Sequence, residues 1–470
     1  MASVMERAAL TRIDAIRMTS DERRNAFAQH LTPPETARLA VSMFSELSAD
    51  QLFVRCLDLG AGTGMLSVAL YDRYDGHIEL LDAVEADPVL ATICDAELAT
   101  IGVPHELFQE DALVGTPDKL YDRIILNPPY KKMAASDIRQ SILPCRSANL
   151  YSAFMAVGLS RLAAGGELVA IVPRSWMNGD YFRSFREYAL GNFSLDAIHV
   201  YGSRSEVFSD TKVLQETMLV HFSKRKQIER IVVSQSVDKD GEIVRTSYHP
   251  QELIDPKELV VRIAPEDANG LSETIASLGL CPSTGKVVDF RNRERIFEER
   301  PEGDDIFPMI YAGNFHNGEL EHPLRIGKPQ WYQAKTKDLK ALRQLIKPGA
   351  YVAVKRFSAK EERRRVVAYP LVLTGDVALE NHVNFIHAGI PRNVVPLRSV
   401  ELARGLSMWL NTTYLDTWFR GVSGSTQVNA GDIKAMPCPS LEKLEEVGLI
   451  WRADMGQEEI DRICKTLVQN

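Results

Sequence analysis

The sequence has few cysteines and no long apolar run. No stretch approaches the roughly 20 consecutive apolar residues of a membrane-spanning helix, so no membrane segment is expected. Charged residues at positions 6, 7 and 12 precede any apolar stretch, and we therefore expect no secretory signal. No Cys-x-x-Cys pair occurs among the cysteines, which are Cys56, Cys94, Cys145, Cys281, Cys438 and Cys464. Their scatter argues against a disulfide framework and a structural zinc site and favours a reducing cytoplasm.

Acidic residues outnumber basic ones, but the excess is uneven. The 470 residues include 55 Lys and Arg against 63 Asp and Glu, which gives a formal net charge of −8. This balance argues weakly against nucleic-acid binding by the whole surface. Between positions 325 and 365, however, 13 Lys or Arg stand against 3 Asp or Glu, interleaved with Trp331, Tyr332, Tyr351 and Phe357. Such a stretch suits a phosphate backbone, although solvated helix faces over core aromatics give the same composition.

Length and patterning predict two folded units. At 470 residues the chain is too long for one ordinary core, and a hydrophobic content of 45% is typical of a soluble globular protein. Strand and helix patterns alternate from residue 53 to about residue 222, which predicts a mostly parallel sheet with helices on both faces. An amphipathic helix is expected in the first 30 residues, and Thr32 and Glu35 have the spacing of a capping box. We predict an α/β, Rossmann-like domain over residues 1–225 and a separate mixed α/β domain over residues 226–470.

A glycine-rich loop, Gly60–Gly64, follows the first predicted strand. Glycine lets a ligand approach the backbone where a Cβ would collide with it. Glu85 ends the next strand, 21 residues after Gly64, where its carboxylate can accept both hydroxyls of a ribose. Asp111 follows the third strand, in position to accept a hydrogen bond from an adenine amine. The G-x-G-x-G spacing differs from the G-x-G-x-x-G loop that binds a pyrophosphate, so it favours S-adenosylmethionine over a nicotinamide cofactor.

The tetrapeptide Asn127-Pro128-Pro129-Tyr130 follows a further predicted strand. Ligands of open α/β sheets bind outside the carboxyl ends of strands, and two prolines make this turn stiff. An exocyclic aromatic amine is a poor nucleophile because its lone pair is delocalised into the ring. The Asn127 side-chain oxygen and the Pro128 carbonyl can each accept one of its N–H bonds, which aims the lone pair at a sulfonium methyl group. Tyr130 offers a ring on which a base can stack.

Taken together, these motifs resemble the gamma-ordered, TaqI-like DNA adenine-N6 methyltransferases of restriction–modification systems. The resemblance covers residues 30–222 and rests on Thr32-Pro33-Pro34, LDLGAGTG, VEADP, QEDAL, NPPY and the stretch from Asn149 (NLYSAF, then GGELVAIVPRSW). It implies methyl transfer from S-adenosylmethionine to the N6 of an adenine in a specific duplex sequence, in the cytoplasm of a prokaryotic cell. No metal is expected. Because the sequence contains no convincing metal-dependent nuclease cluster, a cognate restriction endonuclease is expected on a separate chain.

The resemblance also implies roles for single residues. Thr32 would contact the methionine moiety, and Phe154 would lie beside the cofactor. The cofactor residues implied in all are Thr32, Asp58, Gly60, Gly62, Glu85, Asp111 and Phe154. Ala112 departs from the larger apolar residue that relatives often place against the adenine. Since a base must leave the duplex stack before it can react, a second ring is expected opposite Tyr130, and Phe208 is the candidate, with an ordinary core position as the alternative.

The second half contributes weaker signals. The segment from Phe419 to Pro439 is similar to the closing segment of target-recognition domains in related modification enzymes. Five of its polar residues are candidates for contacts to phosphates or base edges, with a helix-capping loop as the alternative: Ser423, Ser425, Thr426, Gln427 and Asn429. In the basic stretch, Arg363, Arg364 and Arg365 are expected to contribute to DNA binding.

Other activities fit parts of the same pattern. Release-factor glutamine methyltransferases also use Asn-Pro-Pro-Tyr, but they are much shorter. An RNA amine methyltransferase is less compatible with the Thr32 segment and the C-terminal tail. Cytosine-C5 chemistry needs a Pro-Cys nucleophile, and Pro144-Cys145 and Pro437-Cys438 lie outside the register of the cofactor loop. A non-catalytic DNA-binding subunit is disfavoured by the intact Asn127 and Glu85.

Overall fold

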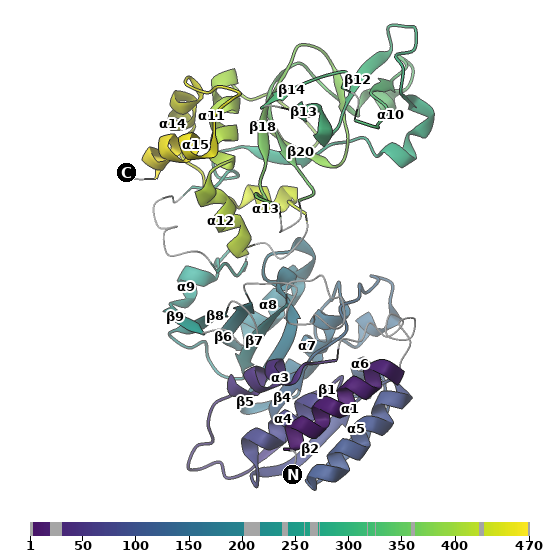
Figure 1. The fold of residues 1–470 in the computed structure, drawn as a ribbon, viewed down its shortest axis with the longest axis vertical. Helices are drawn as coiled ribbons and strands as arrows, with labels where there is room; N and C mark the ends of the chain where they lie inside the picture. Colours follow the sequence, from purple (N-terminus) through teal and green to yellow (C-terminus); the bar gives the residue numbers. More distant parts are fainter. Residues whose placement is uncertain are drawn as a thin grey trace. The chain divides into compact units, whose positions relative to one another are not determined.

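A computed structural model describes residues 3–18, 31–201, 217–236, 243–257, 259–263, 271, 273–316, 318–324, 326–358, 362–422 and 427–468. The chain divides into two compact units, Met1–Ile263 and Ala264–Asn470 (Figure 1). The division falls later than residue 225, where the sequence places it. The reason is that two further strands, β8 (Ile231–Ser236) and β9 (Val244–Tyr248), join the sheet of the first unit.

A nine-stranded sheet forms the centre of the first unit, in the order β3-β2-β1-β4-β5-β7-β6-β8-β9. Besides β8 and β9, its strands are β1 (Val54–Leu59), β2 (Ile78–Val84), β3 (His105–Phe108), β4 (Tyr121–Leu126), β5 (Leu162–Pro173), β6 (Ser194–Tyr201) and β7 (Thr217–Ser223). Strands β3, β2, β1, β4 and β5 run parallel, whereas β7 is antiparallel to both of its neighbours. The predicted Rossmann-like α/β fold is confirmed.

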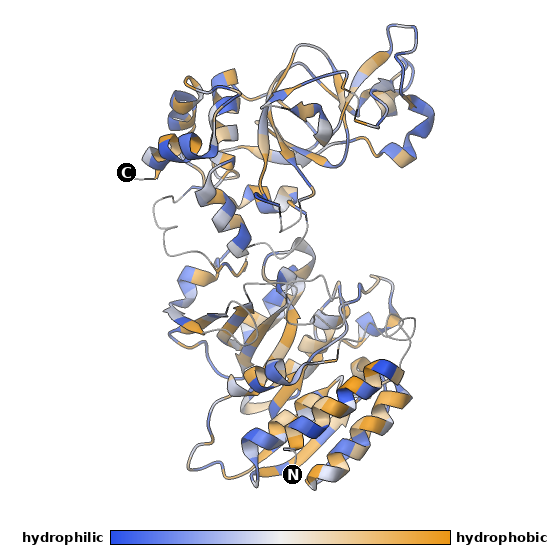
Figure 2. Ribbon diagram, in the orientation of Figure 1, coloured by the Kyte–Doolittle hydropathy of each residue, from blue (hydrophilic) through white to orange (hydrophobic). Residues whose placement is uncertain are grey.

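Helices cover both faces of this sheet. One hydrophobic core contains buried residues of α1 (Val4–Met18), α3 (Pro34–Ser42), α4 (Met65–Tyr74) and α5 (Pro88–Ile101), and the other contains those of α6 (Ala112–Gly115), α7 (Leu150–Ser160) and α8 (Arg183–Asn192). The inner strands are nearly continuous apolar runs, as expected for a sheet buried on both sides, and they are largely orange in Figure 2. No helix in the described part of the chain is long and apolar enough to cross a bilayer.

The capping box proposed for Thr32 and Glu35 is wrong. Helix α3 begins at Pro34 with Pro33 as its N-cap, and no side chain caps it. Two consecutive prolines set the entry into the helix, since proline suits the first turn and lacks the N–H that a cap would satisfy. The Thr32 hydroxyl is therefore free of a capping role, and it hydrogen-bonds elsewhere.

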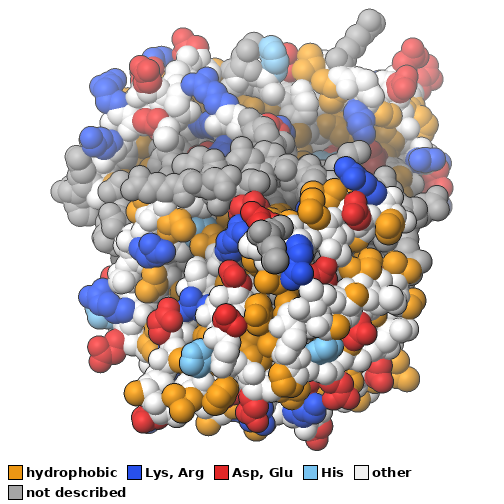
Figure 3. Space-filling model, turned by 60° about the horizontal axis from the view of Figure 1, so that its bottom comes forward, with side chains coloured by type: hydrophobic (Ala, Val, Ile, Leu, Met, Phe, Trp, Pro, Cys, Tyr) orange, Lys and Arg blue, Asp and Glu red, His pale blue; other side chains and the backbone are white. Residues whose placement is uncertain are grey.

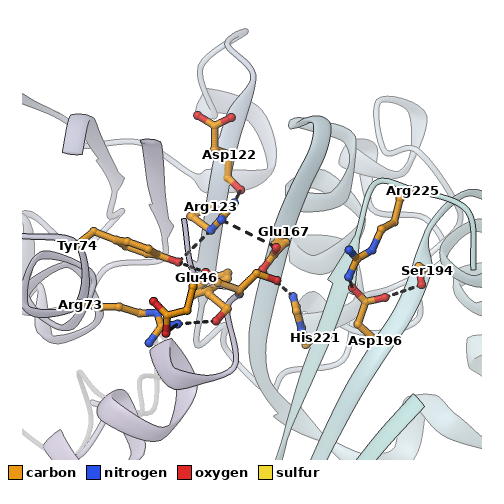
Figure 4. Close-up of polar contacts among 12 residues, drawn as sticks. Glu46, Arg73, Tyr74, Asp122, Arg123, Glu167, Ser194, Asp196, His221 and Arg225 are labelled. Atoms are coloured by element: carbon orange, nitrogen blue, oxygen red, sulfur yellow. Dashed lines mark hydrogen bonds and ion pairs between the residues drawn. The ribbon is translucent and has the colours of Figure 1, made fainter. Parts of the chain in front are cut away.

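A network of buried charges joins β4, β5 and β7 toward the start of the parallel strands (Figure 4). Arg123 Nε donates to the Tyr74 hydroxyl at 3.0 Å, and an Arg123 nitrogen lies 3.9 Å from Glu167 Oε1. His221 Nε2 donates to Glu167 Oε2 at 3.1 Å. Burial by itself raises the pKa of Glu167, but hydrogen bonding and attraction to His221, together with Arg123, outweigh it and lower the pKa to about 2. The carboxylate therefore stabilises the fold in its ionised form.

The second unit combines small sheets with a helical layer. Its sheets have the orders β10-β20-β17-β18, β11-β15-β12-β19-β16 and β13-β14. The strands are β10 (Cys281–Thr284), β11 (Ile296–Phe297), β12 (Ile306–Ile310), β13 (Phe315–His316), β14 (Glu319–Leu320), β15 (Trp331–Gln333), β16 (Leu345–Ile346), β17 (Gly349–Lys355), β18 (Ala368–Leu373), β19 (Val377–Leu379) and β20 (Val383–His387). The helices from residue 400 on are α11 (Val400–Leu410), α12 (Thr413–Val422), α13 (Ala430–Lys434), α14 (Leu441–Gly448) and α15 (Gln457–Cys464). The prediction of a separate mixed α/β unit is confirmed.

Glycine is required where α11 and α14 cross. A Cβ on Gly405 would lie 1.7 Å from the Leu444 carbonyl oxygen, and one on Gly448 would lie 1.9 Å from that of Glu401. The two helix backbones are in direct contact there, so no larger residue fits.

Candidate active site

The loops that follow β1, β2, β3 and β4 lie at one edge of the sheet, because these strands are parallel and adjacent. Gly60 N donates to the Val84 carbonyl at 2.9 Å, and Glu85 N donates to the Phe108 carbonyl at 3.0 Å. The first residue of each loop thus hydrogen-bonds to the end of the neighbouring strand. The glycine loop, Glu85, Asp111 and the Asn127 tetrapeptide thus share this edge, as the strand order predicts.

The glycine loop has the backbone that only glycine adopts readily. Gly60 and Gly62 have φ of +84° and +60°, in the left-handed region. A Cβ on Gly60 would lie 3.2 Å from the Phe154 ring, and one on Gly62 would lie 3.2 Å from Leu31. The loop is therefore a backbone-lined cradle that lies close to Phe154 and to the segment before α3.

Two buried carboxylates lie beside this cradle. Glu85 accepts from Gly62 N and from Asp87 N, both at 2.8 Å, so its orientation is fixed. Burial raises the pKa of Glu85. Asp58 is fully buried on β1 and accepts from the Ser67 hydroxyl at 2.7 Å. Burial raises the pKa of Asp58 to about 7, the Ser67 hydrogen bonds oppose the rise, and Glu85 adds to it.

Asp111 has a partner that the sequence did not suggest. One carboxylate oxygen accepts from Leu113 N at 3.0 Å and caps α6, and the other accepts from Arg139 Nη1 at 2.8 Å. Arg139 also binds Asp137 at 2.6 Å, within the loop that follows the tetrapeptide. Each carboxylate oxygen has two acceptor sites, so a bond from an adenine amine remains compatible with these contacts.

Asn127 is held from both sides directly after β4. Its Nδ2 donates to the Thr32 hydroxyl at 2.9 Å, and its Oδ1 lies 3.1 Å from the Tyr130 hydroxyl. That hydroxyl is also 3.1 Å from the Ile171 carbonyl on β5. Thr32 is only 5% exposed, so water competes little for the first contact. The structure thus brings together Thr32 and the tetrapeptide, which lie 95 residues apart in the sequence.

Tyr151, on α7, packs against the tetrapeptide. Tyr151 contacts Tyr130 edge-to-face, with ring centroids 6.3 Å apart, and its hydroxyl lies 2.7 Å from Ser175 Oγ. Sequence reasoning singled out Phe154 on this helix and missed Tyr151, whose spacing alone looks like ordinary core. Burial raises the pKa of Tyr130, so its phenol keeps its proton near neutrality.

Comparison with known proteins identifies the family of this chain. The model of the Eco57I restriction-modification methylase family matches residues 95–208. The chain is 32% identical to the type II methyltransferase M.BsuBI of Bacillus subtilis, over 98% of each protein. The chain belongs to the type II restriction–modification methyltransferases. It is also 31% identical to the type II methyltransferase M.PstI of Providencia stuartii, over 97% of this chain and 95% of that protein.

Solved structures share the fold of this type II methyltransferase. The type IIL restriction-modification enzyme MmeI in complex with DNA has a TM-score of 0.61 at 11% identity, over 98% of this chain and 78% of that one. The DrdV–DNA complex has a TM-score of 0.54 at 14% identity, over 96% of this chain and 60% of that one. Their fold agrees with the confirmed α/β architecture.

The basic stretch of the methyltransferase is divided between core and surface. Arg365 is fully buried, with its guanidinium 5.3 Å from the Phe419 ring centre and its Nε 3.1 Å from Ser358 Oγ. Arg364 donates to the Asn411 carbonyl, and only Arg363 of the three is exposed. The expectation that all three contribute to DNA binding is therefore wrong for Arg365, because its charge is enclosed in the second unit's core.

Exposed cations do remain in that stretch. Five of them form no ion pair with any residue of the described ranges: Lys335, Lys337, Lys340, Arg343 and Arg363. On the face shown in Figure 3, by contrast, basic and acidic side chains are interspersed.

The remaining candidates are either undescribed or engaged in contacts of their own. Phe208, Ser423, Ser425 and Thr426 lie outside the described residues. Gln427 accepts from Arg356 at 3.3 Å, and Asn429 forms a capping box with Asp432 at the start of α13, so the helix-capping alternative is confirmed for Asn429.

The two Pro-Cys pairs do not provide an activated thiol. Burial raises the pKa of Cys145 to about 11 and raises that of Cys438 further. A thiolate, which C5 chemistry would require, is therefore disfavoured at both positions. No group of three potential metal ligands occurs among the residues that the structure describes.

Proposed function

We propose that this type II methyltransferase transfers a methyl group from S-adenosylmethionine to the N6 amine of an adenine that is flipped out of duplex DNA. The observation that carries the proposal is the Asn127 amide, fixed directly after β4 at the same sheet edge as the glycine loop. An amide oxygen and a rigid prolyl carbonyl are acceptors matched to the two N–H bonds of an exocyclic amine.

Asn127 and Pro128 would activate the target amine. Asn127 Oδ1 and the Pro128 carbonyl accept the two N–H bonds and localise the nitrogen lone pair, which then forms the new N–C bond. The transferred methyl leaves its electron pair on sulfur, and the amine gives up one proton to water afterwards. Tyr130 acts through its ring and not as a base, because burial raises the pKa of its phenol.

The cofactor would lie along the glycine loop. Gly60 and Gly62 would line it, Glu85 would accept the ribose hydroxyls, and Phe154 would lie beside it. Asp111 would accept from the adenine amine while Arg139 holds the other side of the carboxylate. When bound, S-adenosylmethionine supplies an electrophilic methyl group on a sulfonium centre.

DNA recognition would involve the second unit. Its exposed Lys335, Lys337, Lys340 and Arg343 offer positive charge to phosphates, which gives affinity without base specificity. Tyr130 would stack on the flipped adenine, with Phe208 as the candidate for its other face. The cognate endonuclease would be a separate chain.

The test compares wild type with Asn127→Ala on methylated product. Wild type, given radiolabelled S-adenosylmethionine and unmodified genomic DNA, should yield N6-methyladenine on nucleoside analysis. Asn127→Ala should lose at least 100-fold, or about 2.7 kcal/mol of transition-state stabilisation, while affinity for S-adenosylhomocysteine stays near that of wild type. Label in cytosine, RNA or protein instead, or full activity of the variant, would refute the proposal.

A further inference from the structure

We propose that Thr32 is a positioning residue, whose hydroxyl selects which side of the Asn127 amide faces the target amine. This inference rests on the proposed function, since it assigns Asn127 Oδ1 the task of accepting an N–H bond. The contact is direct: Asn127 Nδ2 donates to Thr32 Oγ1 at 2.9 Å, and Thr32 is 5% exposed.

Orientation matters because the two ends of an amide do opposite things. The oxygen accepts hydrogen bonds and the nitrogen donates them, yet the terminal torsion of asparagine is broad and roughly two-fold. An Asn127 turned by 180° would present its NH₂ to the target amine. Two donors would then face each other, and the lone pair would not be localised.

Tyr130 alone does not fix the orientation. Its hydroxyl lies 3.1 Å from Asn127 Oδ1 and also 3.1 Å from the Ile171 carbonyl. If the phenol donates to Ile171, its oxygen becomes an acceptor, which suits an inverted amide as well as the observed one. Thr32, which accepts from Nδ2 at the other end of the amide, supplies a contact that distinguishes the two orientations.

Thr32 decides through its single proton. While its oxygen accepts from Asn127 Nδ2, the hydroxyl proton points away from the amide and is available to an acceptor elsewhere. The residue before it, Leu31, lies beside Gly62, so the segment that carries Thr32 borders the glycine loop while Thr32 itself contacts Asn127. A ligand acceptor in the cradle that takes this proton leaves Thr32 only its lone pairs, and Asn127 must then offer its NH₂. Cofactor occupancy would in this way hold the amide oxygen toward the target.

The test uses variants that separate the hydroxyl from its methyl group. Thr32→Val keeps the shape and removes the acceptor, whereas Thr32→Ser keeps the hydroxyl. Thr36→Val makes the same change at a buried threonine four residues along, in α3, as a control for the loss of a hydroxyl. Thermal unfolding checks that each variant is folded, and S-adenosylhomocysteine titration gives the concentration needed to saturate each one.

Single-turnover methylation of genomic DNA is then measured at saturating S-adenosylmethionine. We expect Thr32→Val to be about tenfold slower, equivalent to about 1.4 kcal/mol, with Thr32→Ser and Thr36→Val within about twofold of wild type. The side-chain NH₂ resonances of Asn127, identified by their loss in Asn127→Ala after selective asparagine labelling, should shift in Thr32→Val and not in Thr36→Val.

Each other outcome has a distinct meaning. A Thr32→Val rate equal to wild type, or a Thr32→Ser rate as low as that of valine, overturns the positioning role and leaves the proposed function intact. Unmoved Asn127 resonances in Thr32→Val also overturn it. A wild type that transfers no methyl to DNA overturns the proposed function instead, and the resonance comparison still tests the contact.

Discussion

The buried carboxyl of Asp58 should give the stability of the protein an unusual dependence on pH. Its pKa is about 7 in the folded chain, against 3.8 for an ordinary aspartate, because burial penalises the charge. A raised folded pKa means that the folded state binds the extra proton, so this contribution is complete below about pH 4 and is lost as pH rises through 7. The total is on the order of 4 kcal/mol, and about 3 kcal/mol of it falls between pH 5 and 8.

Asp58→Asn removes this titration. In urea unfolding at pH 5 and pH 8, the wild type should lose about 3 kcal/mol more than the variant over that interval. Ser67→Ala is the control, because it deletes a hydrogen bond that lowers the pKa of Asp58. The pKa should rise in this variant, so its loss of stability should extend to higher pH than that of the wild type. Identical pH profiles for wild type and Asp58→Asn would refute the reasoning, because the buried carboxyl would then not titrate in this range.

Three further predictions follow from charges at defined places. Glu167→Gln should lower the free energy of unfolding by about 3 kcal/mol near neutrality. The folded pKa of about 2 lies below the unfolded value, so the wild type loses this stabilisation as pH falls from about 4 to 2. Urea unfolding of the variant should therefore depend less on pH in this range, and an unchanged pH dependence would contradict this. Glu85→Gln should weaken S-adenosylhomocysteine binding by roughly 10- to 100-fold in calorimetry, since an amide accepts only through its oxygen, and unaltered affinity would exclude its ribose role. Arg365→Ala should lower the free energy of unfolding by about 3 kcal/mol and Arg363→Ala by less than about 0.5, and equal values would contradict the buried placement of Arg365.

Much of the candidate site is predictable because it follows from strand order. Once alternating strands and helices imply a parallel sheet, Gly60, Glu85, Asp111 and Asn127 must end neighbouring strands at one edge, and they do. The local patterns needed are short, and each lies within one strand and the turn after it.

Contacts between distant segments were not predictable. Nothing near Thr32 indicates that its hydroxyl meets Asn127, and the adjacent prolines suggested a cap instead. Arg139 pairs with Asp111, which lies 28 positions earlier in the sequence, and the sequence around Arg365 suggests a basic surface although its side chain is buried. The predicted boundary at residue 225 falls before β8 and β9, because the alternation of strands and helices in the sequence ends near residue 222 whereas the sheet continues to Tyr248.

Strand β4 has a buried ionic network near its start and leads into the proposed reaction site at its end. Arg123 and its partners lie near the start, whereas Asn127 follows the last residue, about 13 Å farther along at 3.3 Å per residue. Mutations that raise heat resistance often reduce turnover when both depend on the same residues. The ionic network and the proposed reaction site are thus separated along β4, so substitutions that stabilise the protein around Glu167 are expected to leave the proposed site as mobile as before.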